Sequence, residues 1–155
     1  MNGNSGRRSF IARITALLAL PFALPRLARA QSDAESVDAM VLKLTGGATV
    51  GHGRVKLDIP LLADNGNSVS LKVSVDSPMT SANYVKSIHL YPARNPRPNI
   101  ANFYVGPRTG RAQISTRIRL GGTQRVLAIA ALSDGSFWSG VADVAVTSSA
   151  CWDES

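Results

Sequence analysis

The stretch that most restricts the fold is "SVSLKVSVD" at residues 68–76, where apolar and polar side chains alternate strictly. The four apolar residues that fall on one side of an extended chain are Val69, Leu71, Val73 and Val75. Successive side chains of a β-strand point to opposite faces of the sheet. The alternation therefore predicts a strand that covers a core on one side only.

Similar segments recur along the chain, at residues 54–59, 84–91, 100–105, 111–120, 124–132 and 141–147. Turn signals separate them, among them "DNGN", "NPRPN", "GPRTG", "LGGTQ" and "SDGSF". "QRVLAIAAL" at 124–132 is apolar on both faces, which places it centrally in a sheet. About seven short strands at this spacing predict an all-β, immunoglobulin-like sandwich.

A short helix is expected before the strands, through "AESVDAMVLKL" at 34–44. Ser32 or Asp33 is a suitable N-cap, because its side-chain oxygen accepts a hydrogen bond from a free amide of the first turn. Gly46 and Gly47 supply the stop, since glycine readily adopts the left-handed conformation that ends helices.

The first thirty residues have the pattern of an export signal. Arg7 and Arg8 precede "SFI", an apolar run from Ile14 to Leu24 follows, and Ala28-Arg29-Ala30 is a cleavage site of the A-x-A type. This pattern predicts a twin-arginine signal peptide, cleavage near Ala30 and a periplasmic protein. The apolar run is shorter than the roughly 20 residues of a membrane-spanning helix, so no membrane association is expected after cleavage.

Cleavage changes the charge of the chain. The whole sequence has a net charge of +7, but five arginines and no acid lie in residues 1–30, which leaves 12 basic against 10 acidic residues. A nucleic-acid-binding protein is therefore not indicated. The expected organisation is a signal peptide at 1–30, one sandwich domain at 31–147 and a cysteine-bearing tail at 148–155.

No motif for a metal, a cofactor or catalysis stands out. His52, His89 and Cys151 lack the close spacing of metal-binding motifs, and "LTGGATVGHG" lacks the spacing of a dinucleotide loop. The ordinary interpretation is a solvated loop for His52 and a paired or exposed strand position for His89. No metal, cofactor or catalytic residue is predicted, and the chain is expected not to be an enzyme.

Two further pairs of residues have both structural and functional interpretations. Arg117 and Arg119 point off the same face of a strand, toward solvent or toward a partner or anionic ligand. Phe137 and Trp138 are expected to pack under a hairpin, with an interface role as the alternative.

Several motifs together resemble those of SoxY, the sulfur carrier subunit of the bacterial thiosulfate-oxidising system. They are "NGN" at 65–67, "DSPM" at 76–79, "YVKSIHLY" at 84–91, "NPRP" at 95–98, "STRIRL" at 115–120 and "SDGSFW" at 133–138. They span most of the chain after the signal, in the order of the family, and the signal and leading helix are also those of the family.

This resemblance implies a non-catalytic carrier with an immunoglobulin-like sandwich and a SoxZ-like partner subunit. In the family, sulfur intermediates are attached to a cysteine on a flexible Gly-Gly-Cys-Gly-Gly arm, while separate Sox enzymes load, oxidise and hydrolyse them. Cys151, the single cysteine of the chain, stands where the family has its carrier thiol.

The tail departs from the family pattern around that cysteine. Ser148-Ser149-Ala150 precedes Cys151 and Trp152-Asp153-Glu154-Ser155 follows it, with no glycine. The wide Trp152 restricts entry into a narrow tunnel, and the two carboxylates tend to raise the pKa of the thiol. Three interpretations stay open: a working carrier, a SoxY-derived binding module that has lost the carrier cycle, and a cysteine that forms an intermolecular disulfide. A frameshift in the coding sequence of the tail would resemble the second.

Overall fold

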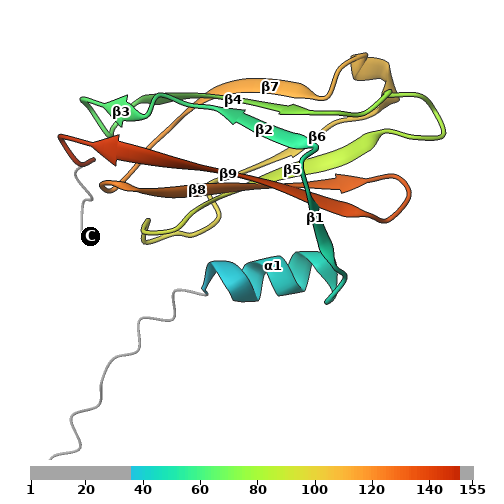
Figure 1. The fold of residues 1–155 in the computed structure, drawn as a ribbon, viewed down its shortest axis with the longest axis horizontal. Helices are drawn as coiled ribbons and strands as arrows, with labels where there is room; N and C mark the ends of the chain where they lie inside the picture. Colours follow the sequence, from blue (N-terminus) through green and yellow to red (C-terminus); the bar gives the residue numbers. More distant parts are fainter. Residues whose placement is uncertain (1–35, 151–155) are drawn as a thin grey trace, which may run out of the picture. The chain divides into compact units, whose positions relative to one another are not determined.

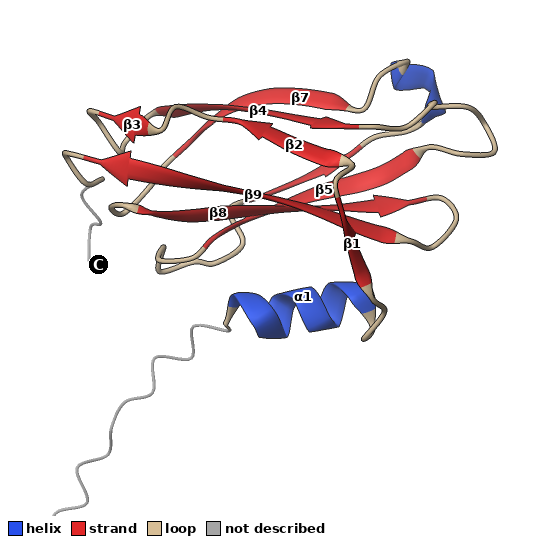
Figure 2. Cartoon of the chain, in the orientation of Figure 1, coloured by secondary structure: helices blue, strands red, loops and turns tan. Residues whose placement is uncertain are grey.

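The structure is a computed structural model, and it describes residues 36–150. These residues form one α-helix, a short 3₁₀ helix (Pro107–Thr109) and nine strands, and the strands form two β-sheets that face each other across a core (Figures 1 and 2). The predicted all-β sandwich with a short N-terminal helix is confirmed, with two more strands than expected. No helix among these residues is both long and apolar enough to cross a bilayer.

The helix α1 spans Val37–Thr45 and lies outside one of the sheets (Figure 1). Its N-cap is Ser36, whose side chain accepts a hydrogen bond from the amide of Ala39, so the predicted caps Ser32 and Asp33 are wrong. Ser36 satisfies an amide that the first turn leaves free. The helix ends at Gly46, which is left-handed with φ 62° and donates its N–H to Leu42, as predicted.

The larger sheet has the strand order β1-β9-β8-β5-β6. Its strands are β1 (Val50–His52), β9 (Phe137–Val146), β8 (Gln124–Leu132), β5 (Val85–Pro92) and β6 (Ala101–Tyr104). The short β3 (Leu62–Ala63) also pairs with β9, in parallel. β8 lies between β5 and β9, which confirms the central position predicted from its apolar sequence.

The smaller sheet has the order β2-β4-β7, with antiparallel pairing throughout. Its strands are β2 (Val55–Asp58), β4 (Val69–Val75) and β7 (Gln113–Ile118). In β4 the four apolar residues of the alternating pattern are buried, while Ser70 and Lys72 are exposed. Figure 1 shows this sheet on the side of the sandwich away from α1.

The core lies between the two sheets and is almost entirely aliphatic. Side chains from both sheets with no more than 2% exposure include Val69, Leu71, Val73, Ile88, Leu90, Val126 and Leu132. Leu120, in the loop after β7, is completely buried. The core therefore extends from the strands to the loop that carries Leu120, and it fixes that loop to the end of the sandwich.

Candidate functional site

The predicted carrier residue Cys151 lies outside the described residues, as does the rest of the tail. The structure does describe the four residues that lead to it, Thr147 to Ala150, which we call the tail base. These residues follow the end of β9 at Val146. Their contacts decide how far the chain leading to the thiol is free to move.

Backbone and side-chain hydrogen bonds attach the tail base to the sandwich. The amide of Thr147 donates to the carbonyl of Ala63 (3.1 Å), and its hydroxyl donates to the carbonyl of Asp64 (3.0 Å). The carbonyl of Ser148 accepts from the amide of Gly66 (2.7 Å). The amide of Ala150 donates to the carbonyl of Leu120 (3.1 Å), and only 3% of Ala150 is exposed.

Gly66 makes the close approach of these segments possible. A Cβ atom at this position would lie 2.4 Å from the carbonyl oxygen of Leu120 and 2.8 Å from the amide nitrogen of Ala150. Both neighbours are backbone atoms, so they cannot rotate away. The carbonyl of Gly66 also accepts from the amide of Leu120 (2.8 Å), so the glycine connects the tail base with the loop after β7.

Two buried side chains hold that loop. Asn95 is 7% exposed and donates from Nδ2 to the carbonyl of Arg119 (2.8 Å), while its Oδ1 accepts from the amide of Gly121 (3.1 Å). Gln124, 5% exposed, donates from Nε2 to the same Oδ1 (2.8 Å) and to the carbonyl of Gly122 (3.2 Å). The acceptor for Ala150 is therefore part of a loop that is fixed by buried amides.

The attachment of Ala150 limits the length of chain between the sandwich and Cys151. Consecutive Cα atoms are about 3.8 Å apart, so the Cα of Cys151 lies within that distance of the Cα of Ala150. With Ala150 held, no free residue lies between the sandwich and Cys151, whereas release of the tail base would add its four residues, about 14 Å when extended.

Both ring nitrogens of His89 make hydrogen bonds. His89 is 7% exposed; its Nδ1 pairs with Oδ1 of Asn102 (2.8 Å) and its Nε2 with the hydroxyl of Ser87 (2.9 Å). Burial lowers the pKa of His89, and the hydrogen bond with Asn102 partly opposes this effect. Within residues 36–150 no three His, Cys, Asp or Glu side chains are grouped so that they could bind a metal ion.

The sequence-based interpretation of His89 as a paired strand residue is confirmed. His52 is exposed, but it ends β1 rather than lying in a loop, and its Nδ1 pairs with the hydroxyl of Ser139 (2.8 Å). Phe137 and Trp138 begin β9 next to the hairpin at 133–136. The indole N–H of Trp138 donates to the hydroxyl of Ser136 (3.1 Å), and the guanidinium of Arg54 lies 4.7 Å above its ring.

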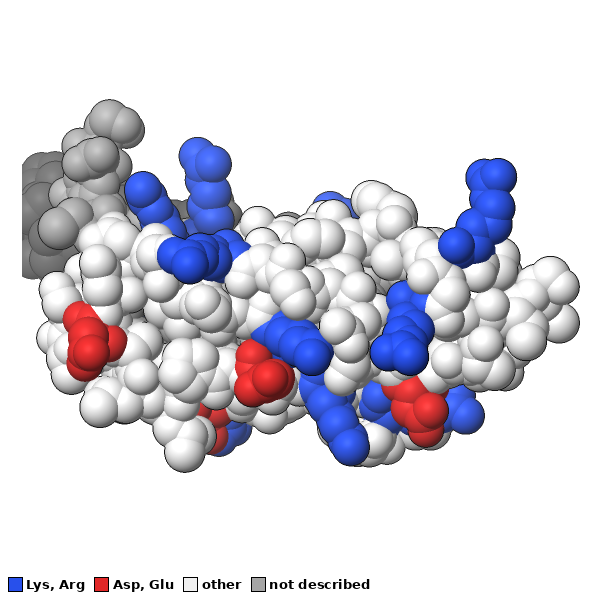
Figure 3. All heavy atoms as spheres, turned by 90° about the horizontal axis from the view of Figure 1, so that it is seen from above, with Lys and Arg blue, Asp and Glu red and all other residues white. Residues whose placement is uncertain are grey.

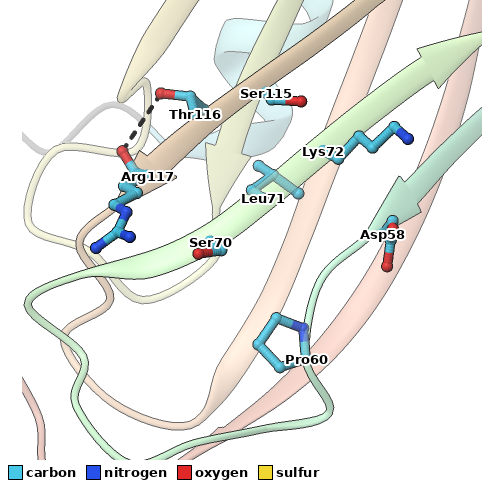
Figure 4. Close-up of a pocket in the computed structure, with 8 residues that line it drawn as sticks. All are labelled: Asp58, Pro60, Ser70, Leu71, Lys72, Ser115, Thr116 and Arg117. Carbon is cyan, nitrogen blue, oxygen red and sulfur yellow. Dashed lines mark hydrogen bonds between the residues drawn. The ribbon is translucent and has the colours of Figure 1, made fainter.

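A shallow depression lies on the outer face of the smaller sheet (Figure 4). Its lining combines the apolar Pro60 and Leu71 with polar side chains, namely Ser70 and Lys72 from β4, Ser115 and Arg117 from β7, and Asp58 at the end of β2. These side chains come from neighbouring strands of one flat sheet, and no acid–base pair or nucleophile is buried among them. The depression has the character of a solvated sheet face rather than of an active site.

Arg117 and Arg119 are exposed while Ile118 and Leu120 are buried, so the predicted outward orientation of the two arginines is confirmed. Sequence reasoning missed the attachment of the tail base and the role of Gly66. The turn signal "NGN" marked the position of the glycine but could not reveal which distant backbone segments approach it.

Comparisons with solved structures show proteins of the same fold. The sulfur carrier protein SoxY from Chlorobium limicola f thiosulfatophilum aligns with a TM-score of 0.61 and 23% identity, over 74% of this chain and 98% of that one. A superoxide reductase (neelaredoxin) from Ignicoccus hospitalis aligns with a TM-score of 0.54 and 18% identity, over 61% of this chain and 80% of that one. At these identities the likeness concerns the fold alone.

The sequence comparison is more specific. No curated protein matches the sequence of the chain. The model of the family described as "Sulfur oxidation protein SoxY", however, matches residues 41–151, which is more than half of the chain. The match runs from α1 through every strand and ends at position 151. The chain therefore belongs to the SoxY family of sulfur oxidation proteins.

Proposed function

We propose that this protein carries sulfur intermediates of thiosulfate oxidation covalently on Cys151 and presents them to partner enzymes. The observation that carries the proposal is the family match, whose last residue is the only cysteine of the chain. The related structure from Chlorobium limicola f thiosulfatophilum is that of a protein described as a sulfur carrier.

The described geometry suits this role. The end of the sandwich holds Ala150 in a fixed place, so the next residue starts from a defined point on the surface. A thiolate is a good nucleophile and a good attachment point for sulfur, because the disulfide-type bond that it forms is broken again by thiol exchange or hydrolysis. The bond chemistry on the cargo belongs to separate enzymes, and the sandwich serves as a rigid support.

We further propose that the protein works in the periplasm after export through the twin-arginine pathway and cleavage near Ala30. It pairs there with a SoxZ-like subunit and is visited by the Sox enzymes that load, oxidise and hydrolyse the cargo. The arginine pair at positions 7 and 8, the apolar run and the A-x-A site support export. Folding of the carrier before export would allow the partner to travel with it.

A Cys151→Ser variant tests the carrier role in cells that grow on thiosulfate. We expect thiosulfate-dependent respiration to be lost while a small partner protein without its own signal still co-purifies. Trp152→Gly is the matched control, because it changes the neighbouring residue and keeps the thiol. Unchanged respiration in the serine variant would contradict a carrier function.

One observation favours a second function, that of a binding module without a carrier cycle. The tail base is attached to the sandwich and Ala150 is buried, so the residues that lead to Cys151 are held in place, in contrast to the flexible glycine arm of the family. Replacement of residues 148–155 by a glycine arm separates the two functions. Restored or increased turnover with partner enzymes indicates a module that lacks only its arm, whereas unchanged turnover indicates that the native tail already enters the enzymes.

A further inference from the structure

A groove lies at the open edge of the sandwich, between the loop that precedes β6 and the strand β7. It encloses about 340 Å³ and is lined by three arginines, Arg97, Arg117 and Arg119, together with the amides Asn95 and Asn99. The remaining lining residues come from β6, from β7 and from position 100. We call it the arginine groove.

No acidic side chain lines the arginine groove. Among residues 36–150 the single ion pair is that of Arg125 with Asp143, which lies elsewhere on the surface. Arg117 donates one hydrogen bond to the hydroxyl of Ser68 (3.2 Å). Within the same residues the side chains of Arg97 and Arg119 have no acceptor, so most of the guanidinium donors of the groove are unpaired in the part of the chain that the structure describes.

The charge of the surrounding surface also favours an anionic ligand. Figure 3 shows Lys and Arg side chains predominating on the face of the smaller sheet, with acidic side chains scattered between them. Three guanidinium groups along one groove repel one another, and an anion bound among them removes that repulsion. The planar guanidinium fork matches the paired oxygens of a tetrahedral oxoanion, and this match favours such a ligand over a simple halide.

The groove and the tail base share one short piece of chain. Arg119 contributes its side chain to the groove, while its carbonyl is held by Asn95. The next residue, Leu120, accepts the hydrogen bond from Ala150. The residue before Cys151 is therefore fixed beside the loop that positions Arg119.

We propose that the arginine groove binds a tetrahedral sulfur oxoanion. This chemistry is common to free thiosulfate and to the sulfonate end of a cargo attached to Cys151, and the second source rests on the proposed carrier function. In that case Arg119 and Arg97 hold the charged end of the cargo near the sandwich, and they determine which cargo the carrier retains.

The first experiment uses free thiosulfate and the full mature chain with Cys151→Ser, so that no cargo forms. Backbone amide resonances of the non-proline residues in 95–101 and of residues 115–120 are followed by NMR while thiosulfate is added at constant ionic strength. We expect saturable shifts, and about fivefold weaker binding in Arg97→Gln and in Arg119→Gln. Arg108→Gln is the matched control: it removes the same charge from an exposed residue of the short 3₁₀ helix at 107–109, outside the groove, and should leave binding unchanged.

The second experiment distinguishes the two sources of the oxoanion. The native thiolate is treated with tetrathionate: it attacks an inner sulfur, the central S–S bond breaks, Cys–S–S–SO₃⁻ forms, and thiosulfate leaves with the electron pair. If the tethered sulfonate occupies the groove, the loaded chain binds free thiosulfate several-fold more weakly than the Cys151→Ser chain. Equal affinities assign the groove to the free ion.

Shifts that do not saturate, or equal weakening by Arg108→Gln, would overturn the proposal, because the interaction would then be unspecific attraction to positive charge. Binding of an Asp- and Glu-rich peptide but not of thiosulfate would overturn it as well and would indicate a protein-binding groove. Neither result depends on whether Cys151 carries sulfur in cells, so a failure of this proposal is distinguishable from a failure of the carrier function.

Discussion

Gly66→Ala is the substitution that should disturb the tail base most selectively. The new Cβ would meet two backbone atoms, at 2.4 and 2.8 Å, and the Cγ1 of Val146 at 3.0 Å. Contacts below 3.0 Å with backbone are relieved only if the segments separate. The loop 64–66, the loop after β7 and the tail base must then move apart.

Three hydrogen bonds depend on this contact: Gly66 to Ser148 (2.7 Å), Leu120 to Gly66 (2.8 Å) and Ala150 to Leu120 (3.1 Å). Each contributes about 0.5–1.5 kcal/mol net, and forced overpacking costs a similar amount. We expect a loss of about 2–4 kcal/mol in the free energy of unfolding. For a domain of this size, that loss lowers Tm by about 8–16 °C.

Thermal unfolding and amide hydrogen exchange measure the two consequences separately. Exchange at Ala150 should become much faster, while exchange in the central strand β8 should change only as much as global stability does. Gly106→Ala is the matched control, because Gly106 is extended, with φ −158°, and a Cβ there meets nothing within 4 Å. If Gly66→Ala and Gly106→Ala unfold at the same temperature, the reasoning about close backbone approach is wrong.

Three other substitutions test separate parts of the account. Ala150→Asp places a charge at a buried position, so it should release the tail base and increase exchange of the Gly66 amide, which donates to the carbonyl of Ser148, with little change in Tm. Unchanged exchange would show that Ala150 is not held. Asn95→Ala leaves its buried partners unpaired, so it should lower the free energy of unfolding, measured in urea, by about 2–3 kcal/mol. An unchanged free energy of unfolding would contradict the hydrogen-bond network that holds the loop. The pKa of His89 is lower in the folded than in the unfolded chain, so the unfolded chain binds the proton more strongly. Stability should therefore fall as the pH drops from 7.5 to below the unfolded pKa of about 6.5, and His89→Gln should reduce that dependence in urea titrations; an identical pH profile would refute the assignment.

The sandwich was predictable from the sequence because most of its strands have a recognisable pattern of apolar and polar residues within the strand itself. The alternation in β4 and the continuous apolar run of β8 each follow from which faces of a strand are buried. Gly46 was predictable as the end of α1 for the same reason, since a left-handed glycine is a local requirement.

Features that depend on distant contacts were not predictable. β1 and β3 have three and two residues, too few for a periodic pattern, and they are strands only because β9 provides a pairing edge.

In the candidate site, too, local features were predictable from the sequence and features that depend on distant contacts were not. Cys151 was identifiable as a candidate because it is the single cysteine of the chain. Arg117 and Arg119 were identifiable because their spacing of two residues predicts that they lie on one strand face. The contribution of Arg97 to the same groove depends on the path of the loop before β6, which no local pattern encodes. The attachment of Ala150 likewise requires Leu120 and Gly66, which are separated by more than fifty residues.

The most direct test of the central claim is the intact mass of the protein purified from the periplasm of thiosulfate-grown cells, measured with and without reductant. We expect additions of sulfur, sulfonate or thiosulfonate mass that reductant removes and that map to the Cys151 peptide. A free thiol under all conditions, or only a disulfide to another chain, would contradict the carrier function and would leave a SoxY fold that serves as a binding module.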